Sequence, residues 1–285
     1  MKIFYIGSSS TLSLIPLKAL LNSKYEICAI ASDNDRNSIF NVITSNSIQS
    51  LALNNSIPFF SLSNEDSYVI SQIEKFQPDV ILTSCYAHRL PQSILSLAKK
   101  GSYNIHPSLL PKFRGPNPLF WQLREGVNEY GITIHRMTEY FDAGNIIVQQ
   151  KVNLDDGLCI DDITKTIATQ AGNLVINTLR NIECDRFVEI IQDEEYSSYQ
   201  SKPEINDYTV SSLWTGKRLF NFINAYKGEG VSFLCAIEGN TYKLIEAFSY
   251  QGTPYENMHN KTVILADRMI MFSCKDGYIQ CGIKV

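Results

Sequence analysis

The sequence has 285 residues, of which 44% are hydrophobic and 19% charged, and its formal net charge at pH 7 is −4. This length suits one large domain with its own core, or a large domain followed by a small one. No stretch reaches the ~20 apolar residues of a membrane span, and residues 1–10 turn polar too early for a signal peptide. We therefore expect a soluble, cytoplasmic protein without membrane contact, whose charge gives no general attraction to nucleic acid.

Short apolar runs alternate with helical patterns over the first 195 residues. The run at 2–7 is rich in β-branched and aromatic residues, ends at a glycine and precedes leucines at helical spacing. Strands that are apolar on both faces predict an α/β fold, a Rossmann-like, mostly parallel sheet with helices on both faces. The expected strands are 2–7, 26–32, 57–62, 79–84, 103–106, 131–137 and 145–154, and the expected helices are 8–23, 46–55, 68–76 and 161–179.

The composition changes near residue 194, where a polar segment with few large aliphatic residues suits a linker. After it, one amphipathic helix at 213–226 is followed by several short apolar runs joined by turn residues. These runs predict a small antiparallel sheet or β-barrel of OB-like type. We expect the domains 1–195 and 207–285, joined by a linker at 196–206.

The cysteines and histidines do not indicate a metal site. The seven cysteines include no C-x-x-C pair, and the four histidines are scattered without ligand spacing. Most cysteines lie in apolar runs, so we interpret them as free thiols and expect no metal.

The stretch NIHPSLLPKFRGPNP at 104–118 combines a histidine with four prolines. Asn104 and His106 are two residues apart at the end of a predicted strand, so both side chains point to the same face. Open α/β sheets bind ligands at the ends of parallel strands, and the prolines make the following loop stiff. The alternative is a strand-end histidine with satisfied hydrogen bonds and prolines that only close a turn.

Asp142 lies before a glycine-containing turn that leads into an apolar strand. A carboxylate there can orient an imidazole and raise its pKa, while the Asn104 amide donates to a developing oxyanion. No serine or cysteine lies in a recognisable nucleophile elbow. Asn104, His106 and Asp142 therefore favour acyl transfer directly from a donor to an acceptor.

NIHPSLLPKFRG at 104–115, GITIH at 131–135 and FDAGNIIVQQ at 141–150 together resemble the signature of formyltransferases that use 10-formyltetrahydrofolate. That family includes methionyl-tRNA formyltransferase, glycinamide ribonucleotide transformylase and N-formyltransferases of nucleotide-linked amino sugars. Some members carry a small β-barrel after the catalytic domain, which residues 207–285 resemble.

The resemblance implies that Asn104 and His106 stabilise the tetrahedral intermediate, while Asp142 assists proton transfer through an ordered water. It also implies a cis Leu-Pro bond in the loop beneath the triad and a pterin pocket that binds mainly through main-chain groups. The implied loop residues are Ser108, Leu110, Pro111, Arg114 and Gly115. The implied pocket residues are Cys85, Tyr86, Ala87, His88, Arg89, Leu90, Met137, Thr138, Glu139 and Tyr140, with His88 a departure from the family pattern.

Charge favours a small-molecule acceptor amine, such as a nucleotide-linked amino sugar, over tRNA. A tRNA-binding protein needs several lysines and arginines to neutralise phosphates. Residues 202–285 hold nine Lys and Arg against eight Asp and Glu, and the segment 32–47 holds one arginine and two aspartates. In the tRNA-specific members the corresponding loop is rich in lysine and arginine.

Several other functions remain open at this point. A glycinamide ribonucleotide transformylase is shorter and has a glycine-containing phosphate loop where this chain has GSSS at 7–10. A formyltetrahydrofolate hydrolase, with water as acceptor, normally carries a further regulatory domain. A folate-binding module without catalysis does not need all three triad residues. The aromatic helix at 213–226 leaves a homodimer open.

Overall fold

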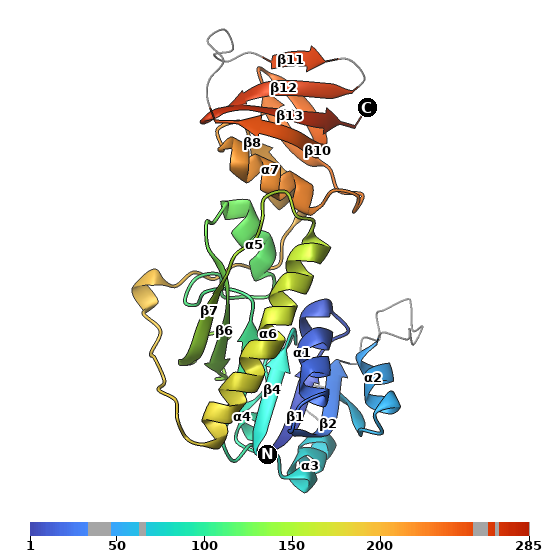
Figure 1. Cartoon of the computed structure of the whole chain (residues 1–285), viewed down its shortest axis with the longest axis vertical. Helices are drawn as coiled ribbons and strands as arrows, with labels where there is room; N and C mark the ends of the chain where they lie inside the picture. The colour runs from blue at the N-terminus through green and yellow to red at the C-terminus, as the bar shows by residue number, and fades with distance from the viewer. Residues whose placement is uncertain (34–46, 63–66, 253–261, 266–267, 285) are drawn as a thin grey trace. The chain divides into compact units, whose positions relative to one another are not determined.

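We describe a computed structural model of the chain for residues 1–33, 47–62, 67–252, 262–265 and 268–284. The described chain forms two compact units, shown with all elements in Figure 1. The larger unit comprises 1–118, 129–152 and 164–200, and the smaller comprises 119–128, 153–163 and 201–285. The segments 119–128 and 153–163 thus belong to the smaller unit. The division into a catalytic domain at 1–195 and a C-terminal domain at 207–285 stays a prediction.

The larger unit contains a seven-stranded sheet in the order β3-β2-β1-β4-β5-β6-β7. The strands from β3 to β5 are parallel, and β6 and β7 pair antiparallel. The predicted fold class, an α/β fold with a mostly parallel sheet, is confirmed. The strands are β1 (Lys2–Gly7), β2 (Glu26–Asp33), β3 (Phe59–Leu62), β4 (Val80–Ser84), β5 (Ser102–His106), β6 (Tyr130–Arg136) and β7 (Ile146–Val152).

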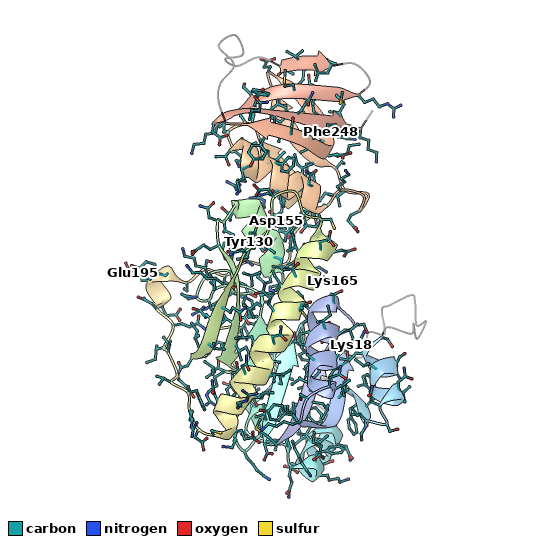
Figure 2. All side chains as sticks on the ribbon, in the orientation of Figure 1. Lys18, Tyr130, Asp155, Lys165, Glu195 and Phe248 are labelled. Carbon is teal, nitrogen blue, oxygen red and sulfur yellow. The ribbon has the colours of Figure 1, made fainter. Side chains whose placement is uncertain are left out.

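Helices cover both faces of this sheet. On one face α1 packs against β1, where the Tyr5 hydroxyl donates to the Ser13 carbonyl oxygen at 2.7 Å. Helix α6 lies beside α1 in Figure 1, and the exposed side chains of Lys18 and Lys165 mark the solvent side of the two helices in Figure 2. The helices are α1 (Thr11–Leu21), α2 (Ile48–Asn54), α3 (Ser67–Phe76), α4 (Gln92–Leu95) and α6 (Ile160–Glu183), the last belonging to this unit from Thr164 onward.

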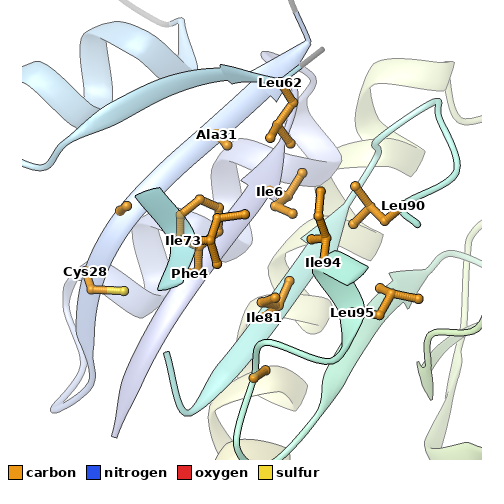
Figure 3. Close-up of a cluster of buried hydrophobic side chains, with 12 residues drawn as sticks. Phe4, Ile6, Cys28, Ala31, Leu62, Ile73, Ile81, Leu90, Ile94 and Leu95 are labelled. Atoms are coloured by element: carbon orange, nitrogen blue, oxygen red, sulfur yellow. The ribbon is translucent and has the colours of Figure 1, made fainter. Parts of the chain in front are cut away.

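The opposite face carries an apolar cluster beneath α3 and α4 (Figure 3). Phe4 and Ile6 of β1 and Ile81 of β4 meet Ile73 of α3 and Ile94 of α4, and all five are at most 6% exposed. Since strands in a parallel sheet are covered on both sides, alternate residues of β1 supply the two faces. The cluster holds β4, with which β5 pairs, and the carboxyl ends of these two strands lead into the candidate site.

The smaller unit contains a six-stranded sheet in the order β11-β12-β13-β10-β9-β8. Only β8 and β9 pair parallel, and α7 packs its buried face, including Leu219 and Phe222, on the sheet. Its elements are α5 (Pro118–Glu125, from Leu119 onward), η2 (Ile205–Tyr208), β8 (Thr209–Ser211), α7 (Gly216–Ala225), β9 (Phe233–Ile237), β10 (Asn240–Gln251), β11 (Thr262–Leu265), β12 (Met269–Cys274) and β13 (Gly277–Ile283).

Asn224 of α7 completes the backbone hydrogen bonding of this sheet. The pairing of β10 with β9 ends at Leu244, and Asn224, which is 7% exposed, bonds the main chain of β10 beyond that point. Its amide donates to the Ala247 carbonyl at 2.9 Å and accepts from the Ala247 N–H at 3.0 Å. The side chain therefore satisfies two buried main-chain groups that would otherwise be costly.

We expect Asn224→Ala to destabilise the smaller unit by roughly 2–4 kcal/mol, because two hydrogen bonds are lost and two buried groups are left unpaired. Urea unfolding followed by tryptophan fluorescence measures this, since both tryptophans, Trp121 and Trp214, lie in the smaller unit. Lys217→Ala is the control on the same helix, because its exposed pair with Asp156 is worth less than about 1 kcal/mol. Equal effects of the two substitutions would contradict the role of Asn224.

Candidate active site

The strand register brings four polar side chains to one face of the sheet. In the antiparallel pair of β5 and β6, Asn104 lies opposite His135 and His106 lies opposite Thr133. Side chains opposite each other in an antiparallel pair point to the same face. Asp142 comes from the turn after β6 and reaches the same place. The structure therefore brings together Asn104, His106 and Asp142, which the sequence analysis singled out, and adds His135.

These side chains form a compact polar cluster. The Asn104 Nδ2 atom donates to Asp142 Oδ1 at 3.3 Å and lies 3.2 Å from His135 Nε2. Asp142 Oδ1 also lies 3.5 Å from His106 Nδ1 and 3.4 Å from His135 Nε2. The side chains of His106 and Asp142 are 4% and 9% exposed, so the cluster is largely shielded from water.

A backbone carbonyl group fixes one protonated nitrogen on each ring. His106 Nε2 donates to the Phe113 carbonyl oxygen at 2.8 Å, because a carbonyl can only accept, and its bare Nδ1 therefore faces Asp142. His135 Nδ1 donates to the Arg136 carbonyl at 2.9 Å, so its Nε2 accepts from Asn104. Both amide hydrogens of Asn104 are thus engaged within the cluster.

The Asp142 carboxylate is held from two further sides. Its Oδ2 accepts from the Gly115 backbone N–H at 2.8 Å. Gly115 has a φ of +113°, and a Cβ at this position would lie 2.1 Å from the Gln200 carbonyl oxygen, so only glycine fits there. Asp142 itself has a φ of +53°, a left-handed conformation that needs support from its surroundings.

The pKa values of the two central groups shift in the same direction for different reasons. Burial lowers the pKa of His106 below 6.5, and this outweighs the nearby Asp142 carboxylate, which raises it. Burial alone would raise the pKa of Asp142. His106, His135 and the Gly115 N–H outweigh burial and hold the pKa of this carboxyl well below its usual range. The cluster thus favours a neutral imidazole beside an ionised carboxylate at neutral pH.

The loop after β5 is held by β6 and β7. Thr133 Oγ1 donates to the Ser108 carbonyl at 2.7 Å and accepts from the Leu110 N–H at 3.1 Å. The Gln149 amide donates to the Leu110 carbonyl at 2.7 Å, and the Leu110–Pro111 peptide bond is cis. The expected loop residues therefore lie directly beneath His106, with Arg114 buried beside Gly115.

The two segments expected to form the pterin pocket, 85–90 and 137–140, meet in the structure. Leu90 is buried in the apolar cluster of Figure 3, against which Met137 packs, and the Arg89 guanidinium lies 5.1 Å from the Phe141 ring centroid. His88 is half-exposed, with its Nε2 3.5 Å from Asp33, and Tyr140 is 73% exposed. The remaining pocket residues, Cys85, Tyr86, Ala87, Thr138 and Glu139, are partly or fully exposed on the same two segments.

His135 is the site residue that the sequence analysis missed. It had been counted among four scattered histidines, although GITIH at 131–135 already belonged to the family signature. The available signal was its spacing of two from Thr133 on a predicted strand, which places both on one face. Which residue of β5 it would face depends on the strand register, which the spacing alone does not give.

The described residues contain neither a candidate metal site nor a candidate membrane span. Within them, no group of three or more His, Cys, Asp or Glu side chains could hold a metal ion. No helix among them is long and apolar enough to span a membrane.

Comparison with known proteins identifies the family. A model of the formyl transferase family matches residues 1–179, which is more than half of the chain. The chain belongs to the formyl transferase family and is a formyl-transferring enzyme, as the motif at 104–150 predicts. The resemblance noted in the sequence is confirmed.

The similar sequences include methionyl-tRNA formyltransferases. One from Syntrophomonas wolfei is 28% identical over 228 residues, covering 79% of this chain and 72% of that protein. Another, from Ehrlichia ruminantium strain Welgevonden, is 30% identical over 179 residues, covering 63% of this chain and 57% of its own length. This chain therefore spans little more than half of the second relative.

The similar structures include sugar N-formyltransferases. An N-formyltransferase from Helicobacter canadensis, in complex with folinic acid and dTDP-3-aminofucose, has a TM-score of 0.71 at 19% identity and covers both chains fully. WlaRD, a sugar 3N-formyltransferase studied with dTDP and 5-N-formyl-THF, has a TM-score of 0.70 at 19% identity, covering 100% of this chain and 98% of its own. At this identity the likeness shows a shared fold.

The site makes a prediction about His106 that solution NMR can test. We expect its pKa to lie below 6.5, with the neutral ring protonated at Nε2, because the ring is buried and Nε2 donates to Phe113. Asp142→Asn should lower the pKa further, since the carboxylate that favours the charged ring is removed. Imidazole ¹⁵N shifts recorded against pH, with His106→Ala for assignment, measure both. A pKa above 6.5, or one that Asp142→Asn leaves unchanged, would contradict this description.

Proposed function

We propose that the protein moves the formyl group of 10-formyltetrahydrofolate directly to the primary amine of a small molecule, namely a nucleotide-linked amino sugar. The proposal depends mainly on one observation, the contact of Asn104, His106 and Asp142 in a buried cluster without a side-chain nucleophile. Direct transfer needs an oxyanion donor and a proton acceptor, and the cluster offers both.

The protonation states suggest a catalytic role for each residue. As the amine attacks the formyl carbon, a C–N bond forms, the carbonyl becomes an oxyanion, and the Asn104 amide stabilises that oxygen. The bare Nδ1 of His106 takes the proton that the attacking amine must lose. Asp142, 3.5 Å away, stabilises the resulting imidazolium. His106 then returns the proton to the folate nitrogen as its bond to the formyl carbon breaks.

Two features of the segments 85–90 and 137–140 support a pterin pocket. In the described part of the chain, the backbone N–H groups of Ala87, His88 and Arg89 make no hydrogen bond to another backbone group. Leu90 and Met137 give the same region an apolar base. Binding sites of this kind combine apolar surface with a few main-chain donors. Both similar structures described above were studied with a formyl-folate compound.

The distribution of charged side chains is the main argument for a small-molecule acceptor. In the described part of the smaller unit, basic side chains pair with carboxylates, as Lys217 does with Asp156 and Arg218 with Glu125. Such pairs reduce the potential that would attract phosphates. The segment 32–47, which matches in position the basic loop of the tRNA-specific members, is poor in basic residues, and 34–46 lie outside the described residues. The structural likeness to sugar N-formyltransferases along the whole chain supports the same acceptor.

Methionyl-tRNA formylation is the second candidate, because the similar sequences are 28–30% identical to enzymes of that name. This function requires a basic surface that binds the tRNA backbone. Tetrahydrofolate release distinguishes the candidates when the protein is mixed with 10-formyltetrahydrofolate and either dTDP-3-aminofucose, charged initiator tRNA or buffer.

We expect release with the amino sugar and not with the tRNA. A sugar with the amine at another carbon belongs in the same series, since the geometry does not select the position. Release with tRNA alone would support the second candidate, and release in buffer alone would support hydrolysis. Folate binding without release of tetrahydrofolate in any mixture would contradict the proposed formyl transfer.

His106→Ala should lower kcat by about 10²–10⁴-fold while leaving the affinity for folate nearly unchanged, because the ring moves a proton and contributes little to binding. Stopped-flow turnover and folate titration measure the two quantities. Lys18→Ala, an exposed residue of α1, serves as the control. Turnover retained by His106→Ala would contradict the assignment of the triad.

A further inference from the structure

The segment that follows α6, residues 186–200, returns to the active site and contacts both of its loops. We call it the return segment; its short helix η1 (Glu194–Tyr196) carries Glu195, labelled in Figure 2. Ile190 exchanges two backbone hydrogen bonds with Ile146 at the start of β7, at 2.8 and 2.9 Å. Further along, Ser198 accepts from the Arg114 N–H at 2.9 Å. The segment therefore spans the distance between the Asp142 turn and the loop after β5.

Gln192 is the buried side chain of the return segment, at 5% exposure. Its Nε2 atom donates to the carbonyl oxygens of Asp142 and Gly144, both at 2.7 Å. Its Oε1 atom accepts from the Nε and Nη2 atoms of Arg114, at 3.1 and 2.8 Å. The carboxamide thus uses both of its hydrogens and both lone pairs, and every partner belongs to one of the two active-site loops.

These contacts close a ring of interactions around the Asp142 carboxylate. Arg114 immediately precedes Gly115, whose N–H donates to Asp142 Oδ2 at 2.8 Å. Gln192 holds the main chain of Asp142 against the side chain of Arg114, so the carboxylate and the N–H that binds it are fixed from both ends. The positive φ of Asp142 needs such support, since this conformation is unfavourable for a residue with a side chain.

We propose that Gln192 is a positioning residue of formyl transfer, which sets the Asp142 carboxylate against the Gly115 N–H and the His106 ring by linking the Asp142 turn to Arg114. The proposal rests on the role of Asp142 in the proposed function. Gln192 does not touch the reacting atoms, and it acts through the geometry of the carboxylate. Misplacement of a catalytic group by about 1 Å costs as much as 10² in rate.

Two substitutions separate the roles of the Nε2 donor and the Oε1 acceptor of the carboxamide. Gln192→Glu keeps the size of the side chain and its contacts with Arg114, and it removes both donors to the Asp142 and Gly144 carbonyls. Gln192→Leu removes both the donor and the acceptor. Glu194→Gln is the matched control, because Glu194 accepts from the same Arg114 guanidinium at 2.8 and 2.9 Å and its side chain is 69% exposed.

We expect both Gln192 substitutions to lower kcat roughly 10- to 100-fold with little change in KM for either substrate. The titratable groups that face Asp142 are His106 of β5 and His135 of β6, which together with the Gly115 N–H keep it ionised. On the proposed function the acidic limb of the pH–rate profile reports the protonation of His106, whose pKa the nearby Asp142 carboxylate raises. If the turn relaxes and the carboxylate moves away from the ring, that limb moves to lower pH. Glu194→Gln should match the wild type in both measurements.

The decisive experiment is a double-mutant cycle with Asp142→Asn. If Gln192 acts through the carboxylate, Gln192→Glu causes no further loss of rate in the Asp142→Asn background. Thermal melting confirms that each variant is folded, and Gln192→Glu, which conserves volume, tests the proposal if Gln192→Leu does not fold. Additive losses, or Gln192 variants with wild-type kcat and pH profile, would overturn it. If Asp142→Asn itself keeps full activity, the proposed function fails instead.

Discussion

The ionised carboxylate of Asp142 in a buried setting is the constraint on which the site depends. Removing a carboxylate from water costs several kcal/mol unless nearby groups compensate. Here the Asn104 amide on β5 and the Gly115 N–H in the loop after β5 donate to the carboxylate, while the rings of His106 on β5 and His135 on β6 lie 3.5 and 3.4 Å from it. Because these groups come from separate parts of the chain, the carboxylate is satisfied only when the strand register and both loops are formed. The chemistry of the site is therefore tied to the correct fold.

Backbone conformations that residues with side chains rarely adopt collect around the same point. Phe113 and Asp142 have φ values of +61° and +53°, and Gly115 has +113°. Each performs a specific task, since Phe113 turns its carbonyl toward His106, Gly115 turns its N–H toward Asp142, and Asp142 turns its side chain into the cluster. Strain of this kind persists where the surroundings determine the conformation. The prolines between 107 and 118 supply part of that rigidity from the sequence itself.

The parts of this arrangement that follow from local periodicity could be predicted, and the parts that depend on distant pairing could not. Apolar runs such as 2–7 and 79–84 indicated the strands of the parallel sheet, and the spacing of Asn104 and His106 indicated a shared face. The four-residue helix at 92–95 and the helix at 118–125 were too short or too irregular to give a period. His135 joins the site through strand register, and its spacing from Thr133 indicates its face but not its partner on β5. Gln192 joins through a contact 50 residues away in the chain and has no local signal.

The hydrogen bonds of Asn104 explain how one small cluster can serve both the resting and the reacting state on the proposed route. Before substrates bind, both amide hydrogens are engaged, one of them by Asp142. When an oxyanion develops, the amide can turn that donor toward it, and the carboxylate loses a partner. At the same step His106 gains a proton at Nδ1, which faces Asp142, so the carboxylate receives a charged donor in exchange. On this route the buried carboxylate exchanges one donor for another and keeps a compensating partner.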